Sequence, residues 1–253
     1  MIIAEINKII GLLNKAAEQI LEVYNNEEFA AEIEWKDDLS PLTVADKRSH
    51  EYLASQLILD FPGIPVMSEE AVQLPFEERR HWQRYWCLDP LDGTREFIKR
   101  NDQFTINLAL IENGRPVLGF IHVPVMGCTY WAAHGRGAYI YQDGDSCRIS
   151  ANRKETDWIA VGSGSHGSDE ERVFLSQFPI AETIKVGSAL KFCMIASGQA
   201  DVYFRSGPTM EWDTAAGHIL VEEAGARLEY LCENLEHYNK QHLVNPSFIV
   251  KIV

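Results

Sequence analysis

The sequence predicts an α/β protein built from stacked layers of helices and strands. Helix and strand patterns alternate along most of its 253 residues, and one central stretch contains only strands joined by turns with Gly and Pro. A chain of this length can bury a large core, either as one domain or as two closely packed halves. We expect the halves to be residues 1–150 and residues 151–253.

Two helices are predicted near the N-terminus. Apolar residues recur at helical spacing over residues 2–24, which indicates an amphipathic helix. After a polar loop, Ser40-Pro41 or Thr43 starts a second helix that runs to about Asp60. Asp46 then lies in the first turn of this helix, where the helix dipole favours a carboxylate even without a catalytic role.

Residues 86–94 are the most informative stretch of the chain. Their apolar start predicts a buried strand, which we expect to end at Pro90 because proline has no N–H for the strand ladder. Asp89 is then at the end of the strand, and Asp92 and Gly93 begin a turn or helix whose free N–H groups favour an anion. Two carboxylates in this setting indicate a divalent cation that connects them to a phosphate. The alternative is a plain strand–turn–helix capped by Asp92.

The rest of the chain continues the α/β pattern. A short strand over residues 66–67 precedes Glu69, and the strands that follow residues 86–94 form an antiparallel meander. The other expected strands are 104–111, 117–123, 129–133, 158–161, 183–187, 201–204, 227–231 and 247–252. The other expected helices are 169–178, 188–197 with Ser188 as its cap, and 213–225 with a C-cap glycine.

Residues 162–167 match the G-x-G-x-x-G pattern of dinucleotide-binding loops. We nevertheless predict no dinucleotide site there. The match lies past the midpoint of the chain, and we expect no second strand–helix–strand unit after it.

Charge and cysteine content argue against several classes of protein. The formal net charge of −14 argues against nucleic acid as a partner, because such binding depends on clustered Lys and Arg. The five cysteines lack the spacing of a zinc site, and their odd number fits a reducing compartment. We find no signal-peptide pattern and no long uninterrupted apolar run, so we expect no membrane span.

Four carboxylates each lie where a strand ends or a helix begins: Glu69, Asp89, Asp92 and Asp213. Oxygen ligands without His or Cys suit Mg²⁺ or Mn²⁺ better than zinc. If these groups converge, they repel one another unless cations are bound. Two or three Mg²⁺ ions would make such a cluster a phosphoryl-transfer site. Taken alone, the pair Glu69-Glu70 is more typical of a solvated surface.

Three motifs contain these carboxylates: Ser68-Glu69-Glu70, Asp89-Pro90-Leu91-Asp92-Gly93-Thr94 and Glu211-Trp212-Asp213-Thr214-Ala215-Ala216-Gly217. With them the chain resembles the inositol monophosphatase family of lithium-sensitive, magnesium-dependent phosphatases, from the first helix to at least Gly225. The resemblance implies a layered αβαβα sandwich of the inositol monophosphatase and fructose-1,6-bisphosphatase type, with the site between the two halves.

The resemblance also implies roles for the site residues. The implied metal ligands are Glu69, Asp89 and the Leu91 carbonyl for one ion, and Asp89, Asp92 and Asp213 for a second. Asp46 and Thr94 would orient and deprotonate the attacking water. The backbone N–H groups of Gly93 and Thr94 would contact the phosphate, and Asp213 would also contact the substrate.

Within that family the chain is most similar to the 3′(2′),5′-bisphosphate nucleotidases, which remove the 3′-phosphate of adenosine 3′,5′-bisphosphate formed in sulfur assimilation. The residues that carry this similarity are Ser165-His166, residues 187–193, residues 203–205 and Gly207-Pro208. The residues implied to line the nucleotide pocket are His166, Ser188, Lys191 and Arg205. A substrate with two phosphates needs cations beyond the metal cluster, and Lys191 and Arg205 can supply them. One departure is Gly162-Ser163-Gly164, where relatives often carry an Arg.

Two other functions stay open at this point. An inositol monophosphatase or sugar bisphosphatase of the same fold is the nearer alternative, and Lys191 and Arg205 argue against it. A non-catalytic nucleotide- or metal-binding regulator is the other, and the complete set of motif residues argues against that. We expect a small nucleotide bisphosphate as the partner and a cytoplasmic location. The oligomeric state and peripheral attachment to the inner membrane face are left open.

Overall fold

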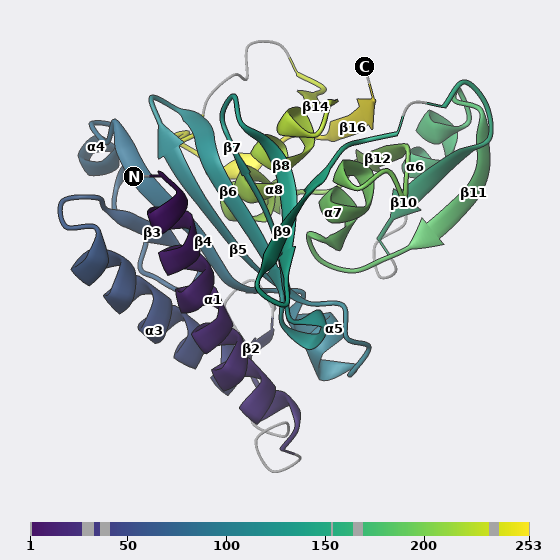
Figure 1. Ribbon diagram of the computed structural model, residues 1–253. Coiled ribbons are helices and arrows are strands. Elements are labelled where there is room, and N and C mark those ends of the chain that lie inside the picture. Colours follow the sequence, from purple (N-terminus) through teal and green to yellow (C-terminus); the bar gives the residue numbers. More distant parts are fainter. Residues whose placement is uncertain are drawn as a thin grey trace.

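Two sheets and three layers of helices alternate through the molecule, as the computed structural model shows (Figure 1). The structure describes residues 2–26, 33–35, 41–152, 154–163, 169–232 and 238–252. The order of layers is α1 with α3, a seven-stranded sheet, α7 with α8, a five-stranded sheet, and α6. The predicted αβαβα sandwich is therefore confirmed.

The seven-stranded sheet runs in the order β3-β4-β5-β6-β7-β8-β9. Its strands are β3 (Val66–Ser68), β4 (Arg84–Asp92), β5 (Thr105–Glu112), β6 (Arg115–Val123), β7 (Cys128–Ala133), β8 (Gly137–Gln142) and β9 (Asp145–Ile149). β3 lies parallel to β4, and every later neighbour in the sheet is antiparallel. The predicted meander is confirmed, since consecutive strands from β4 to β9 pair with one another.

One face of this sheet is covered by α1 (Ile2–Tyr24) and α3 (Val44–Asp60). The second predicted helix begins at Thr43, whose hydroxyl accepts from the Ala45 N–H at 3.2 Å while Asp46 accepts from the Thr43 N–H at 2.8 Å. This reciprocal pairing is a capping box, and it fixes Asp46 in the first turn. The short elements nearby are β1 (Ile33–Trp35), β2 (Pro41–Thr43), α4 (Phe76–Arg79), α5 (Thr94–Ile98) and η1 (Pro124–Met126).

The five-stranded sheet has the order β11-β10-β12-β16-β14. Its strands are β10 (Trp158–Gly162), β11 (Ile180–Lys185), β12 (Val202–Arg205), β14 (Ala226–Tyr230) and β16 (Phe248–Ile252). β10 is parallel to both β11 and β12, and α6 (Asp169–Leu175) and α7 (Leu190–Ala196) make the two crossovers. One of our reasons for rejecting a dinucleotide loop at residues 162–167 was therefore wrong, because a second strand–helix–strand unit does follow.

The middle layer joins the two sheets. α8 (Glu211–Glu223) and α7 share one apolar core with residues of both sheets, from Met67 and Cys87 on one side to Tyr203 and Phe248 on the other. β13 (Thr209–Met210) leads directly into α8 and pairs with β15 (Val244–Asn245), which lies later in the chain. After β9 the chain leaves the seven-stranded sheet and enters the five-stranded sheet. The predicted boundary between the two halves at residue 150 stays a proposal, because both halves contribute to this core.

Three local predictions were wrong in detail. β4 does not end at Pro90 but runs on to Asp92, with one extra residue between Asp89 and Asp92 relative to β5. The bulge places the proline where the ladder is already interrupted, so its missing N–H costs nothing. Ser188 does not cap α7; the N-cap is Ala189, and Ser188 adopts a left-handed conformation with φ 48°. The strand expected at 183–187 lies earlier, at β11.

Glycine at position 119 sets how closely α8 approaches the large sheet. A Cβ at Gly119 would lie 2.4 Å from Ile219 Cγ2 and 2.8 Å from the Ala216 carbonyl oxygen. We predict that Gly119→Ala lowers the free energy of unfolding by about 1–3 kcal/mol through overpacking, as measured by urea unfolding.

A matched control is Gly11→Ala in the exposed middle of α1, where an added Cβ has no neighbour within 4 Å. That change should raise the free energy of unfolding by about 0.5–1 kcal/mol, because alanine loses less backbone entropy in a helix. Equal unfolding curves for Gly119→Ala and wild type would contradict the close packing of α8.

Candidate active site

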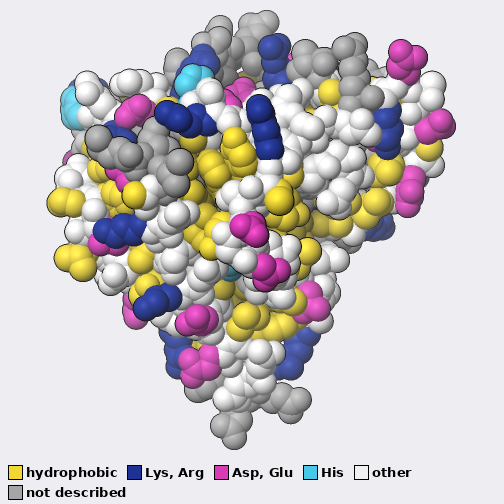
Figure 2. Space-filling view, in the orientation of Figure 1, with side chains coloured by type: hydrophobic (Ala, Val, Ile, Leu, Met, Phe, Trp, Pro, Cys, Tyr) yellow, Lys and Arg dark blue, Asp and Glu magenta, His cyan; other side chains and the backbone are white. Residues whose placement is uncertain are grey.

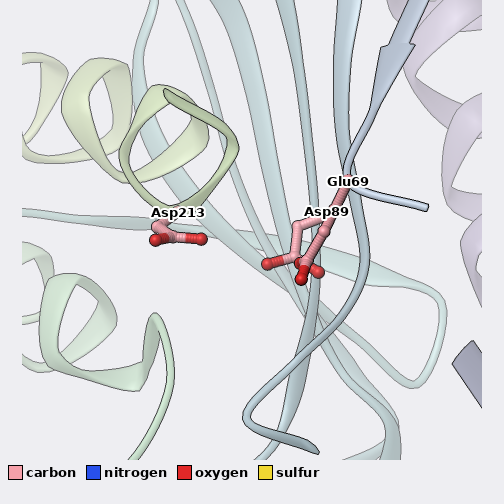
Figure 3. Close-up of side chains that lie close together, drawn as sticks. All are labelled: Glu69, Asp89 and Asp213. Atoms are coloured by element: carbon pink, nitrogen blue, oxygen red, sulfur yellow. The ribbon is translucent and has the colours of Figure 1, made fainter. Parts of the chain in front are cut away.

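Three carboxylates from separate parts of the chain meet at one edge of the seven-stranded sheet. They belong to Glu69, Asp89 and Asp213, and one oxygen of each lies within 4.8 Å of the other two (Figure 3). β3 and β4 are parallel, and the Glu69 N–H donates to the Leu88 carbonyl at 3.1 Å, so Glu69 and Asp89 leave the sheet at the same edge. Asp213 reaches toward them from the first turn of α8.

Backbone hydrogen bonds hold these carboxylates. Asp89 Oδ1 accepts from the Leu91 N–H at 3.1 Å, which the bulge in β4 makes possible, and Asp213 Oδ2 accepts from the Met210 N–H at 2.7 Å. Asp89 is 1% exposed. The fold itself therefore positions the carboxylates of Asp89 and Asp213.

Asp92 lies beside this group and not within it. Its Oδ2 accepts from Asn107 Nδ2 at 3.1 Å and the carboxylate also accepts from the Ala189 N–H. Thr105 donates to Asn107 Oδ1 at 3.0 Å, which orients the amide. Asn107 was missed by our sequence reasoning, although it is a polar residue inside the apolar strand β5, which was a usable signal.

The electrostatics of the cluster favour a bound cation. Burial raises the pKa of Asp89 well above its ordinary value, and the charges of Glu69, Asp92 and Asp213 raise it further. Burial and then Asp92 and Glu69 do the same to the pKa of Asp213. A divalent cation would offset both the cost of burying these charges and their mutual repulsion. The donor set, which contains only oxygen atoms, fits a hard metal ion. The cluster is a candidate metal site.

Asp46 and Thr94 lie next to this cluster and contact each other. Thr94 Oγ1 donates to Asp46 Oδ1 at 3.1 Å, while the hydroxyl and N–H of Thr43 donate to Asp46 Oδ2. Burial raises the pKa of Asp46, and its hydrogen bonds with Thr43 and Thr94 partly oppose the change. The capping box of α3 therefore also aims one Asp46 oxygen at Thr94.

Gly93 allows the chain to turn between β4 and α5. Its φ is 95°, a left-handed conformation that favours glycine. A Cβ at this position would lie 3.0 Å from the Gln103 carbonyl oxygen and 3.2 Å from Ser188 Cβ. Gln103 Oε1 also accepts from the Gly187 N–H at 2.8 Å, so this turn packs directly on the segment that leads into α7.

Two cations, Lys191 and Arg205, line the same cavity as the carboxylates. Lys191, buried on α7, donates to the Ser188 carbonyl at 2.6 Å and the Val186 carbonyl at 3.2 Å, and it lies 5.5 Å above the ring centre of Tyr203. Burial lowers the pKa of Lys191 to about 8, although Asp92 acts in the other direction. Arg205 ends β12, and its buried Nε has no hydrogen-bond partner among the described residues.

The carboxylates and the two cations line one cavity of about 290 Å³. Among its lining residues are the predicted site residues Glu69, Asp89, Leu91, Asp92, Gly93, Thr94, Ser188, Lys191, Arg205 and Asp213. Asp46 contacts this group through Thr94. His166 lies outside the described residues. The roles of the lining residues stay predictions. The structure shows that these residues surround one cavity.

A layered αβαβα fold with a carboxylate cluster between its two sheets defines the class of this protein. The chain belongs to the inositol monophosphatase family, whose model matches residues 4–248. Among curated proteins, the 3′(2′),5′-bisphosphate nucleotidase CysQ of Salmonella typhimurium is 41% identical, covering 98% of this chain and 99% of that protein. The CysQ of Escherichia coli K12 is 40% identical over the same shares.

Solved structures of similar proteins share this fold. The crystal structure of CysQ from Bacteroides thetaiotaomicron, described as a bacterial member of the inositol monophosphatase family, has a TM-score of 0.82 and 38% identity, covering 95% of this chain and 94% of that one. A Thermotoga maritima IMPase has a TM-score of 0.80 and 23% identity over 98% of this chain and 92% of that one, which shows a shared fold. Within the described residues, no helix is long and apolar enough to cross a membrane.

The raised pKa values predict how Mg²⁺ should affect stability. A carboxyl group whose pKa is raised by folding contributes stability below its ordinary pKa of about 4 and loses it as the pH rises through the folded-state value. For Asp89 and Asp213 this loss should be reversed by Mg²⁺, which binds the ionised groups. At 100 times its dissociation constant, one ion adds about 2.7 kcal/mol, or roughly 5–10 °C in melting temperature.

Thermal melts with MgCl₂ or with NaCl at matched ionic strength measure this effect. The difference between the two salts should be larger at pH 8 than at pH 5, because protons compete with the metal at the lower pH. An identical melting temperature in both salts at pH 8 would show that the carboxylates bind no Mg²⁺.

Proposed function

We propose that this protein hydrolyses the 3′-phosphate of adenosine 3′,5′-bisphosphate and releases AMP and phosphate. The observation that carries the proposal is one cavity lined both by the carboxylates and by Lys191 and Arg205. The carboxylates suit a metal-bound phosphate, and the two cations suit a second phosphate. The relatives at about 40% identity over nearly the whole chain are 3′(2′),5′-bisphosphate nucleotidases, which supports the same substrate.

The carboxylates would hold two or three Mg²⁺ ions, with Mn²⁺ as a substitute. The proposed ligands are Glu69, Asp89 and the Leu91 carbonyl for one ion, and Asp89, Asp92 and Asp213 for another. When bound, these ions would supply a nucleophilic water at neutral pH and offset the charge of the reacting phosphate.

The chain's own groups would orient and deprotonate that water. Thr94 Oγ1 gives its proton to a hydrogen bond with Asp46, so its lone pairs stay available to accept from the water. Asp46, with its pKa raised by burial, is suited to take up the proton that leaves through Thr94. The N–H groups of Gly93 and Thr94 would contact the phosphate, and Asp213 would also contact the substrate. The protein mainly supplies positioning and charge.

The second phosphate is the feature that would separate this substrate from inositol monophosphate. Arg205 presents a guanidinium that can bind a phosphate with two parallel hydrogen bonds, and its buried Nε is still without a partner in the described structure. Lys191 already donates to two carbonyls, and an ammonium has one further donor. Ser188 and His166 are proposed to complete the nucleotide pocket.

The proposed partner is this small nucleotide, and we propose no nucleic-acid partner. On the face shown in Figure 2, Lys and Arg side chains are interspersed with Asp and Glu, which does not favour a nucleic-acid backbone. We also propose a cytoplasmic location, because all five cysteines are free thiols and this fits a reducing compartment.

The metal assignment predicts large losses of activity in two variants. Asp89→Asn or Asp213→Asn should lower kcat at least about a hundredfold, since roughly 3 kcal/mol of transition-state stabilisation depends on the metal site. Phosphate release at saturating Mg²⁺ measures this. Asp143→Asn, in the exposed turn after β8, is the matched control and should behave as wild type. Near-normal turnover in either site variant would exclude the assignment.

The assignment of the second phosphate predicts selective losses. Lys191→Ala or Arg205→Ala should lower kcat/KM for adenosine 3′,5′-bisphosphate roughly ten- to hundredfold, because a charge-assisted hydrogen bond contributes about 1.5–3 kcal/mol. Adenosine 3′-monophosphate should be affected much less, since it lacks the second phosphate. Lys185→Ala, at the exposed end of β11, is the control.

Three results would count against the proposal. Equal losses on both substrates would place Lys191 and Arg205 at the reacting phosphate or in the scaffold. A wild-type protein that prefers inositol monophosphate or a sugar bisphosphate would replace the nucleotidase assignment and leave the metal site intact. A protein that binds Mg²⁺ and nucleotide without releasing phosphate would be a regulator.

A further inference from the structure

Glu211 is a buried carboxylate outside the cavity, two residues before Asp213. It is the first residue of α8, and its side chain is 0% exposed. It does not belong to the group of carboxylates that face one another at the metal site. A buried charge is costly unless it is paired and hydrogen-bonded, so its partners indicate what it stabilises.

Within the described residues, the Glu211 side chain has its hydrogen-bond and ion-pair partners on β4 and in residues 239–240. Glu211 Oε1 lies 2.8 Å from Lys240 Nζ and accepts from the Lys240 N–H at 2.9 Å, while Oε2 accepts from the Asn239 N–H at 2.8 Å. The Tyr85 hydroxyl on β4 donates to Oε2 at 3.3 Å. Asn239 adopts a left-handed conformation with φ 68°, and this turn points two successive N–H groups at one anion.

The same segment also holds the backbone around Glu211. The Glu211 N–H donates to the Leu243 carbonyl at 3.0 Å, and Asn245 Nδ2 donates to the Met210 carbonyl at 2.7 Å. Met210 is the residue whose own N–H binds Asp213 Oδ2. Residues 238–245 thus enclose the start of α8 on the side away from the cavity.

We propose that Glu211 is a positioning residue for the metal site: paired with Lys240, it fixes the start of α8 so that Asp213 stays opposite Glu69 and Asp89. The inference rests on the proposed metal-dependent function. Glu211 touches neither metal nor substrate in this scheme. It acts by holding the helix turn that carries Asp213, because a shift of that turn would move the Asp213 oxygens away from the other two carboxylates.

The far end of α8 provides a control with the same chemistry. Glu223 is also mostly buried, and its two oxygens accept from the N–H groups of Gly135 and Gly137 at 2.7 Å each. Glu223→Gln therefore removes a carboxylate with two backbone partners from the same helix, but it does so away from Asp213. Both Glu→Gln changes are expected to lower the melting temperature.

The experiment is Mg²⁺ titration by calorimetry of wild type, Glu211→Gln, Lys240→Met, Lys240→Arg and Glu223→Gln, together with kcat for each. Glu211→Gln and Lys240→Met should both weaken Mg²⁺ binding about 10- to 100-fold, the range found when a residue that supports a metal ligand is lost. Lys240→Arg should restore most of the affinity. Glu223→Gln should bind Mg²⁺ as wild type does.

The pair of variants separates positioning from simple electrostatics. Lys240→Met removes a positive charge near the cluster, so a purely electrostatic effect would tighten Mg²⁺ binding, whereas loss of positioning weakens it. Tighter or unchanged binding in Lys240→Met, or equal weakening in Glu223→Gln, would overturn the inference. Lys240 is 13% exposed and easier to replace than Glu211, so it keeps the test decisive if Glu211→Gln fails to fold. A wild type that binds no Mg²⁺ would instead overturn the proposed function.

Discussion

Repulsion between a buried carboxylate and two half-buried ones is the constraint on which this structure depends. Glu69, Asp89 and Asp213 are held within 4.8 Å of one another, and burial with mutual repulsion raises the pKa of Asp89 and Asp213. Such an arrangement cannot be maintained by the side chains themselves. It persists because backbone donors bind the carboxylates at Asp89 and Asp213, and because each of these backbone segments is fixed by a sheet or a helix start. The free energy stored in this way becomes affinity for a cation.

The middle helical layer contributes both an acidic and a cationic residue to the site. α7 and α8 pack in the same apolar core between the two sheets, so the cation Lys191 and the ligand Asp213 are placed by neighbouring helices. Ser188, in its left-handed conformation, turns its carbonyl to Lys191 while the adjacent Ala189 N–H binds Asp92. Two successive residues, Ser188 and Ala189, therefore connect Lys191 with Asp92. This connection fixes the position of the cation relative to the carboxylate.

Most of the layered fold could be predicted from the sequence, because periodic apolar patterns mark the long helices and the meander directly. The capping box at Thr43 and Asp46 was also readable, since capping is a local interaction. The bulge at Pro90 and the left-handed conformation of Ser188 could not be predicted from the sequence. Both depend on strand register and on contacts with distant residues. For the same reason, the contact of Asp92 with Asn107 could not be predicted from the sequence, nor could the contact of Glu211 with the turn at Asn239. These contacts form only when the strands and helices are packed together.

The distance along the chain between Glu69 and Asp213 has a consequence for how the protein folds. The two other carboxylates come from the neighbouring strands β3 and β4, but Asp213 joins them only when α8 docks between the sheets. A site with all three carboxylates therefore needs α8 in place between the sheets. Contacts that are absent from the folding transition state slow unfolding without speeding folding. If the site binds a cation as proposed and α8 docks after that state, the ion would lengthen the lifetime of the native protein and leave the rate of its formation nearly unchanged.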